Sequence, residues 1–263
     1  MMDIVPEITK NSITKLINEG ERPDGRSVDE YRNIFVEPGV ISKAEGSARV
    51  KLGDTQVIAG IKPSIGTPFP DTPDVGVLMT NCELLPMASP DFEAGPPSPD
   101  SVELARVVDR GIRESQLIDL DKLCIKEGEK VWMLFVDLHV IDYDGNLFDA
   151  CNLAVMSALM DCKIPQATLV DDEVELDYDN MVSLSINDKL SLSTFVKIGD
   201  GIVLDPSLDE ERILDARLTV GISEEGNCVC SMQKGGSEPL TRDEILDSVH
   251  TAFEVKDGLL GNL

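Results

Sequence analysis

The stretch that decides the fold of this chain is residues 130–165, KVWMLFVDLHVIDYDGNLFDACNLAVMSALMDCKIP. Residues 131–141 are nearly all apolar and β-favouring, which is typical of a strand covered on both faces. Residues 142–146 (DYDGN) predict a tight turn, because Gly and Asn tolerate positive φ. Small apolar residues over 148–163 predict a closely packed helix, which Ile164-Pro165 ends. A glycine turn that leads from a strand into a helix N-terminus can hold an anion, because free backbone N–H groups converge there.

The residues before this stretch predict short strands and two helices. An amphipathic helix is expected over residues 4–18, with Ile8, Ile13, Leu16 and Ile17 on one side. Alternating apolar and polar residues over 46–61 predict a hairpin around Gly53. Residues 86–99 contain five prolines and predict a loop without regular structure. A helix follows from Pro99 to about Leu117, with Val102, Ala105, Val108 and Ile112 turned inward.

The residues after it repeat the pattern of several strands followed by a helix. An α+β fold made of two similar halves fits this order better than alternating βαβ units. The expected organisation is an N-terminal helix over residues 1–21, a first half over 22–166 and a second half over 167–263.

Composition excludes several classes of function. The chain has 49 acidic and 23 basic residues, a net charge of −26, and such a field repels nucleic acid and anionic membranes. Six cysteines without a CxxC pair, with only two histidines, favour buried free thiols over a metal site. No apolar run reaches the roughly 20 residues that span a bilayer, and no signal-peptide pattern is present, so we expect a cytoplasmic protein.

Motifs for catalysis or cofactor binding are missing from the sequence. It contains no Walker loop, no GxGxxG after a strand, no HExxH and no GxSxG, so no cofactor is expected. Asp205, Asp209 and Asp215 lie near predicted strands, where an acid could face a cleft. Acidic residues are too numerous for any one of these to be singled out.

Three arginines share one stripe of the helix over residues 99–117. Arg106, Arg110 and Arg113 are spaced i, i+4 and i+7. They are either a solvated face paired with neighbouring acids, or planar donors for phosphates or for carboxylates of a partner.

Several motifs together resemble the RNase PH family of phosphorolytic ribonucleases. They are RPDGR (22–26), GSARVKLGDT (46–55), RVVDRGIR (106–113), DYDGNLFDA (142–150) and the Ile164-Pro165 end. Three more are similar to the branch formed by the non-catalytic ring subunit of the archaeal exosome, namely DGRSVDEYR (24–32), KIGDGIVLDPSLDEE (197–211) and LTVGISEEGNCVCSMQKGG (218–236). The resemblance covers about residues 5–256.

This resemblance implies a duplicated α+β fold related to the second domain of a ribosomal small-subunit protein. It also implies a six-membered ring in which three copies alternate with three copies of a catalytic RNase PH-like homologue. The reaction of such a ring is attack of phosphate on the 3′ end of RNA, and cap proteins with S1 or KH domains gather the substrate.

The resemblance also gives the turn at residues 142–148 a specific meaning. Active members carry Gly-Ser-Arg or Gly-Thr-Arg there to hold the phosphate nucleophile. The matching positions here are Asn146, Leu147 and Phe148, which lack both the hydroxyl and the cation. Three acids are expected to crowd the turn and repel phosphate instead, namely Asp142, Asp144 and Asp149.

Asp215 matches the general acid of active members, and without a phosphate site it is expected to be vestigial. Arg106, Arg110 and Arg113, with Arg110 and Arg113 foremost, become candidates to hold RNA phosphates beside the catalytic partner. The main prediction is a non-catalytic ring subunit that contributes to RNA binding. The alternatives are an active phosphate-dependent 3′–5′ exoribonuclease that uses Asp215, and a purely structural subunit that never touches RNA.

Overall fold

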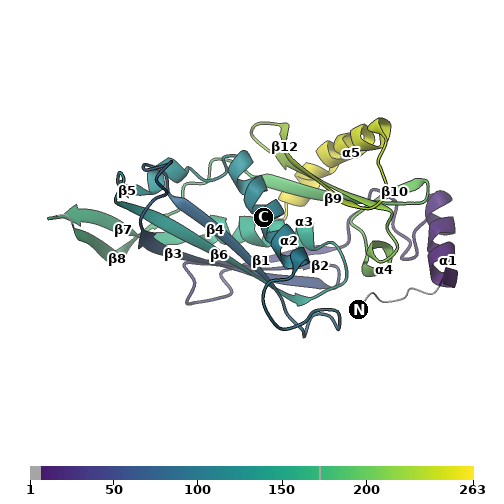
Figure 1. Cartoon of the computed structure of the whole chain (residues 1–263), viewed down its shortest axis with the longest axis horizontal. Helices are drawn as coiled ribbons and strands as arrows, with labels where there is room; N and C mark the ends of the chain where they lie inside the picture. The colour runs from purple at the N-terminus through teal and green to yellow at the C-terminus, as the bar shows by residue number, and fades with distance from the viewer. Residues whose placement is uncertain (1–6, 172) are drawn as a thin grey trace.

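Two β-sheets with a buried helix between them form the body of the protein (Figure 1). The computed structural model describes residues 7–171 and 173–263. The first sheet has the order β1-β2-β3-β6-β4, with β5 pairing with β6, and only the β4–β6 pair is parallel. Its strands are β1 (Ile34–Pro38), β2 (Gly46–Leu52), β3 (Thr55–Gly66), β4 (Val77–Leu84), β5 (Cys124–Lys126) and β6 (Lys130–Asp142).

The second sheet is antiparallel, with the order β10-β9-β11-β12. Its strands are β9 (Leu190–Ile198), β10 (Gly201–Leu204), β11 (Ala216–Ser223) and β12 (Cys228–Gly236). Between the two sheets in the sequence, β7 (Lys163–Val170) and β8 (Glu173–Ser183) form a two-stranded ribbon that extends beyond the first sheet (Figure 1). The expected division between residues 166 and 167 falls within β7, and the domain bounds stay a prediction.

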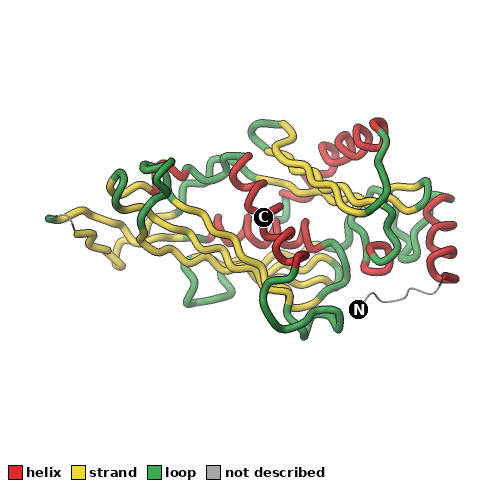
Figure 2. Tube along the Cα trace, viewed as in Figure 1, coloured by secondary structure: helices red, strands yellow, loops and turns green. Residues whose placement is uncertain are grey.

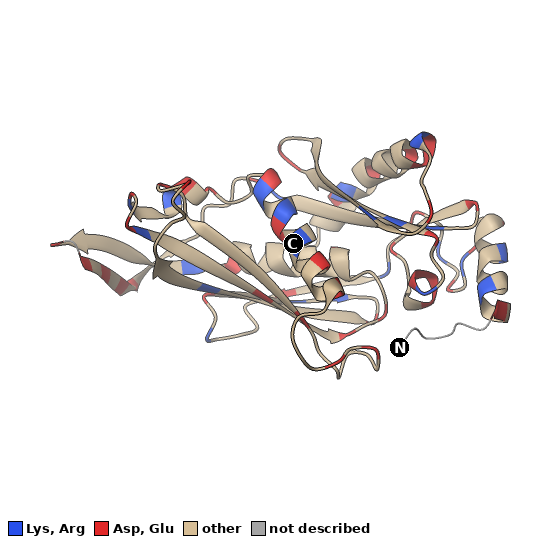
Figure 3. Ribbon diagram, viewed as in Figure 1, with Lys and Arg blue, Asp and Glu red and all other residues tan. Residues whose placement is uncertain are grey.

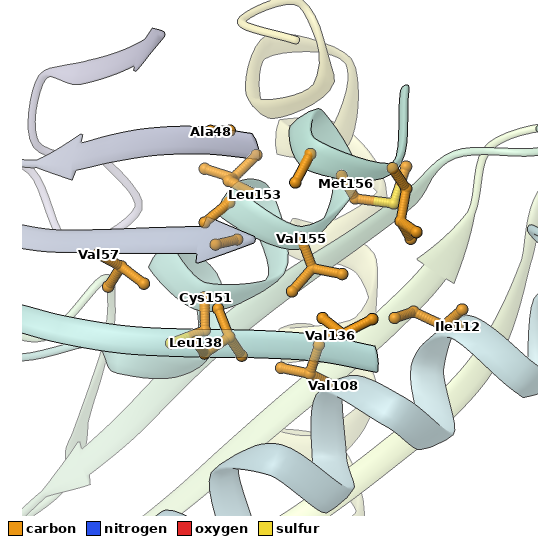
Figure 4. Packing of buried hydrophobic residues seen from close by; sticks show 14 of the residues in the cluster. Ala48, Val57, Val108, Ile112, Val136, Leu138, Cys151, Leu153, Val155 and Met156 are labelled. Atoms are coloured by element: carbon orange, nitrogen blue, oxygen red, sulfur yellow. The ribbon is translucent and has the colours of Figure 1, made fainter. Parts of the chain in front are cut away.

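Helix α3 (Leu147–Asp161) is the centre of the hydrophobic core. Every residue from Phe148 to Leu159 is buried, as expected for a helix that is apolar on all sides. It packs on β2 and β3 of the first sheet and on β9 of the second. Figure 4 shows α3 against the sheet and α2, with the labelled residues Ala48, Val57, Val108, Ile112, Val136, Leu138, Cys151, Leu153, Val155 and Met156.

The remaining helices lie around these layers (Figure 2). They are α1 (Glu7–Asn18), α2 (Pro99–Glu114), the 3₁₀ turn η1 (Leu120–Leu123), α4 (Leu208–Glu211) and α5 (Arg242–Leu260). Helix α2 packs on β4 and follows the predicted proline-rich loop, with Ser98 as its N-cap and Pro99 in its first turn. Helix α5 packs on β9 and β11, and its Thr241–Glu244 capping box is formed.

Several local expectations were wrong. In β6 every residue at an even position from Trp132 to Val140 is buried. On the opposite face Met133, Phe135 and His139 are half-buried and Asp137 is exposed, so one face of the strand is covered rather than two. The reason is that α3 and α2 cover only one side of this largely antiparallel sheet. Helix α3 ends at Asp161, and Ile164-Pro165 belongs to β7.

The helix faces also differ in detail from the prediction. Ile13 and Ile17 anchor α1, whereas Ile8 is 84% exposed because the contact with β10 reaches only the later turns of the helix. Val102 of α2 is 44% exposed, since it faces the groove described below. The expected helical residues 4–6 lie outside the described residues.

All six cysteines are free, but only Cys82, Cys151 and Cys162 are buried, and Cys228 is exposed on β12. Over residues 7–171 and 173–263, no helix is both long enough and apolar enough to cross a membrane.

Candidate functional site

The turn before α3 has the backbone geometry that the sequence predicts. Gly145 and Asn146 have φ values of 88° and 53°. A Cβ at Gly145 would lie 2.5 Å from the carbonyl oxygen of Pro206, so this position requires glycine on steric grounds as well. The turn is therefore fixed against the segment that leads into α4.

A carboxylate of the protein itself occupies the anion position of this turn. The backbone N–H of Asn146 donates to Glu211 Oε1 at 2.8 Å, and the hydroxyl of Tyr143 donates to Glu211 Oε2 at 2.5 Å. Burial raises the pKa of the Glu211 carboxyl, while the hydrogen bonds from Tyr143 and Asn146 lower it. Glu211 thus takes a backbone donor that a helix N-terminus can otherwise offer to an anion.

The three acids that were expected to crowd the turn have other partners. Asp142 accepts from Gln56, and Asp144 lies 3.4 Å from Arg32 in an ion pair. Asp149 points under α3 toward β9. Acids do surround the turn: burial raises the pKa of Asp144, and the charges of Asp54, Asp209 and Asp142 raise it further. The sequence did not predict that Glu211, 65 positions away from Asn146, is the carboxylate that takes the backbone donor.

Position 148 is a phenylalanine instead of a cation, and an arginine from another strand lies beside it. Phe148 is buried, and the guanidinium of Arg217 from β11 lies 4.2 Å above the centre of its ring. Arg217 is also paired with Glu103 of α2 at 2.7 Å, and Glu103 accepts a further hydrogen bond from Gln233. A guanidinium is therefore present near the turn, but it is engaged by an aromatic ring and a carboxylate.

These side chains line a small cavity of about 260 Å³. Leu147 and Phe148 form part of its wall, and Phe92 of the proline-rich loop stacks on Tyr143 with ring centres 5.1 Å apart. Arg212 and Asp91, 3.5 Å apart, also link this loop to the end of α4. Apolar and aromatic groups share the lining with Arg212 and Arg217, and these two arginines are already paired with Asp91 and Glu103.

Beneath the turn, buried ion pairs join the two sheets. Asp205 is fully buried and accepts from Arg26, Arg32 and the side-chain amide of Asn146 at 2.7–2.9 Å. Arg22 and Glu210 form a second buried pair at 2.6 Å. The arginines of residues 22–32 therefore hold the second half against the turn, and Asp205 does not face a cleft.

Asp149 lies in the same buried network. It accepts hydrogen bonds from Tyr31, Thr194 and Asn146. Burial raises its pKa to about 7, with a further contribution from the nearby charge of Asp205, although the hydrogen bonds from Asn146 and Thr194 act in the opposite direction.

The other two candidate aspartates are separate from the cavity. The carboxylate of Asp215 accepts the backbone N–H of Gly199 at 2.7 Å, which holds the turn between β9 and β10. Asp209 is exposed on α4. Neither residue lines the cavity at the turn.

The arginine stripe lies in a separate, larger groove between α2 and β12, with a volume of about 1010 Å³. Arg106, Arg110 and Arg113 all line it and are exposed, and basic and acidic bands alternate along α2 in Figure 3. Arg113 is held by Asp109 at 2.7 Å and by the carbonyl oxygen of Leu78. Within the described residues, Arg106 and Arg110 form no hydrogen bond or ion pair.

The two sites share a boundary at Glu103, which lines both the small cavity and the arginine groove. The sequence predicted the arginines and the altered turn. It did not assign roles to Glu211, Arg217, Tyr143 and Phe92, although two of the quoted motifs contain one of them each: DYDGNLFDA contains Tyr143, and KIGDGIVLDPSLDEE ends at Glu211. In the parts of the chain that the structure covers, no group of three His, Cys, Asp or Glu side chains could hold a metal ion.

Comparison with known proteins gives consistent matches over almost the whole chain. Residues 30–165 match the model of domain 1 of the 3′ exoribonuclease family (RNase PH), and residues 190–255 match its domain 2. The exosome complex component Rrp42 of Methanothermobacter thermautotrophicus is 64% identical over 253 residues, which cover 96% of this chain and 93% of that protein. The protein of the same name from Thermococcus kodakarensis is 46% identical over 96% of this chain and 93% of its own.

Solved structures agree with these matches. A chain of the Archaeoglobus fulgidus exosome with RNA bound to the active site has a TM-score of 0.90 and 44% identity, and the match covers 98% of this chain and 99% of that chain. Rice Rrp46 is only 16% identical, with a TM-score of 0.69 over 91% of this chain and 97% of its own, and it shows the fold alone.

Proposed function

Because the chain belongs to the RNase PH family of 3′ exoribonucleases, we propose that it is a non-catalytic ring subunit of an exosome that degrades RNA from the 3′ end by phosphorolysis. Its relatives named as exosome components match over nearly their full length, and two similar solved chains, 44% and 42% identical, belong to archaeal exosomes. In this ring, three copies of the chain alternate with three copies of a catalytic homologue.

One observation carries the non-catalytic part of the proposal. The N–H of Asn146, which would bind phosphate, donates to Glu211 of the same chain. Phe148 stands where active family members carry a cation. The guanidinium of Arg217 already contacts the Phe148 ring and forms an ion pair with Glu103. An anion that entered the turn would meet the carboxylate of Glu211, while the guanidinium of Arg217 already has these two contacts.

The alternative, an active exoribonuclease that uses Asp215, is not favoured. The carboxylate of Asp215 is engaged with Gly199 and does not line the cavity at the turn. A general acid must reach the reacting group within hydrogen-bond distance. Asp215 is therefore a structural residue in this proposal.

RNA contact is assigned to the arginine groove. Arg106 and Arg110 are exposed on adjacent turns of α2, and their guanidinium groups are free to bind phosphates. Arg113, held by Asp109 and Leu78, has fewer free donors and chiefly shapes the groove. Contacts of this kind hold the RNA backbone without reading its sequence.

The test is reconstitution with the catalytic homologue. The chain alone should release no nucleoside diphosphate from RNA in the presence of phosphate, whereas the purified complex should do so, and mass measurement should give equal numbers of the two subunits. Phosphorolysis by this chain alone would refute the non-catalytic assignment.

The groove is tested in the same complex with Arg106→Glu/Arg110→Glu. We expect RNA binding to fall at least about tenfold, since two phosphate contacts are lost and two negative charges are added. Lys10→Glu/Arg242→Glu makes the same charge change on exposed residues of α1 and α5. If both variants form complete rings and bind RNA equally well, the subunit is purely structural.

A further inference from the structure

The β7–β8 ribbon has an open edge that the proposed function does not use. Residues of β7 pair with one edge of β8, for example Ala167 with Leu176 and Thr168 with Glu175. Within the described residues, the other edge of the eleven-residue strand β8 pairs with no strand. Backbone donors and acceptors on this edge are therefore available to another chain, most regularly over residues 173–177, because β8 bulges at residues 178–180.

One face of this ribbon is strongly acidic. Six of the nine residues from 171 to 179 are Asp or Glu, and residues 164–188 contain no Lys or Arg. Glu173, Glu175 and Asp177 are exposed and alternate along β8, so their side chains lie on one face about 7 Å apart. No Lys or Arg of the described chain pairs with these three carboxylates. Figure 3 shows the acidic bands along the ribbon.

Apolar side chains are exposed beside the acidic residues. Tyr178 is 68% exposed and Val182 is 47% exposed, and both lie on β8. Midway along the ribbon, the paired residues Ala167 and Leu176 pack against the main core and anchor it, whereas Tyr178 and Val182 stay exposed. A partner strand would thus find main-chain, apolar and charged contacts on the same element.

The energetics indicate what kind of partner fits. A two-stranded ribbon is only marginally stable by itself, and like charges at alternate positions of one face repel each other. A third strand with positive side chains at alternate positions would pair with the open edge and neutralise these carboxylates. RNA would meet the same carboxylates as like charges.

We propose that β8 binds an extended segment of a partner protein, with Lys or Arg at every second position, as a third strand of the ribbon. This surface contains no residue of the arginine groove and does not depend on the assignment of the exosome ring. The other interpretation of the acidic face is that it only protects an open edge from aggregation.

The proposal is tested with the full chain and a labelled ten-residue peptide that alternates Lys with Thr or Val. The peptide should bind the wild-type chain and slow amide hydrogen exchange along β8. A peptide of the same composition with all lysines in one block should bind at least about tenfold more weakly, because only the alternating order matches the period of a strand.

Two matched variants separate the ribbon from the overall charge of the chain. In E173Q/E175Q/D177N we expect at least a tenfold loss of peptide affinity. D247N/E254Q/D257N removes the same charge from exposed residues of α5 and should bind like the wild type. Thermal unfolding of both variants checks that they fold. If the ribbon variant does not fold, hydrogen exchange of the wild-type chain with the peptide still shows whether β8 is protected.

Three results would overturn the proposal. Equal losses in the two variants would show that the peptide responds only to net charge. Unchanged exchange along β8, or equal binding of the two peptides, would exclude strand pairing. Displacement of the peptide by an RNA oligonucleotide that binds the ribbon would assign the surface to nucleic acid instead.

Discussion

Asp149 illustrates how a single residue couples the two sheets. It lies in the first turn of α3, and its carboxylate accepts from the backbone N–H and the hydroxyl of Thr194 on β9. The hydroxyl of Tyr31 donates to it from the segment after RPDGR. Three parts of the chain that are distant in sequence therefore meet at one buried carboxyl.

This residue should make stability depend on pH. Because the pKa of Asp149 rises from 3.8 to about 7 on folding, the native state keeps a proton that the unfolded state releases between these values. The free energy of unfolding should then fall as pH rises from about 4 to 7, by on the order of 4 kcal/mol from this group. Urea unfolding of the wild type and of Asp149→Asn across this range isolates the effect as the difference between the curves. A difference that is independent of pH would contradict it.

Glu211 is the second residue with a testable role. Glu211→Ala leaves the N–H of Asn146 and the hydroxyl of Tyr143 without their acceptor, so we expect the free energy of unfolding to fall by about 2 kcal/mol. Glu211→Gln should lose less, because its amide oxygen can still accept from Asn146. Added phosphate should stabilise Glu211→Ala more than the wild type at equal ionic strength, since the anion position is then open. Equal stabilisation of both proteins would show that Glu211 is not what excludes phosphate.

At the scale of elements, the close contact of α3 with β2 holds the first sheet to the core. A Cβ at Gly46 of β2 would lie 2.3 Å from the carbonyl oxygen of Ala158 and 2.7 Å from the Cα of Cys162. Both obstacles belong to the backbone at the end of α3 and cannot rotate away. Gly46 is therefore required by packing, although its φ is not positive.

Gly46→Ala should separate α3 from the sheet and lower the free energy of unfolding by about 3 kcal/mol. Gly60→Ala on the neighbouring strand β3 is the control, because a Cβ there would meet only Ala44, at 4.0 Å. Thermal or urea unfolding measures both variants. Similar stability of the two would contradict the packing role of Gly46.

At the scale of the whole molecule, net charge determines what the chain can bind by itself. A charge of −26 repels RNA over most of the surface, and the exposed arginines of α2 form only a local exception. Affinity for RNA must therefore come mainly from a more basic partner.

We expect the isolated chain to bind RNA negligibly at physiological salt and the assembled complex to bind it with steep salt dependence. If four phosphates of a single strand are neutralised, affinity should fall roughly 50-fold between 50 and 200 mM salt. Filter-binding titrations of the chain and the complex measure this. Strong binding by the isolated chain would show that its surface holds RNA without a partner.

The sequence by itself determined the elements around α3 and the residue types at the turn, where Asn146, Leu147 and Phe148 supply neither a hydroxyl nor a cation. Local patterns suffice to predict these elements, because the signals act over a few neighbouring residues. The signals are hydrophobic periodicity, the positive φ that Gly145 and Asn146 tolerate, and the prolines of residues 86–99. The replacement of a cation by Phe148 is likewise visible in the sequence once the family resemblance is recognised.

Only the tertiary structure decided what fills the turn. Glu211 and Arg217 reach Asn146 and Phe148 across about 65 to 70 positions of sequence, and no local pattern encodes which acid or arginine will arrive there. The same holds for the single covered face of β6 and for the difference between Arg113, held by Asp109 and Leu78, and the free Arg106 and Arg110. These outcomes depend on how the two sheets close around α3, because burial and ion pairing are set by the assembled fold rather than by neighbours along the chain.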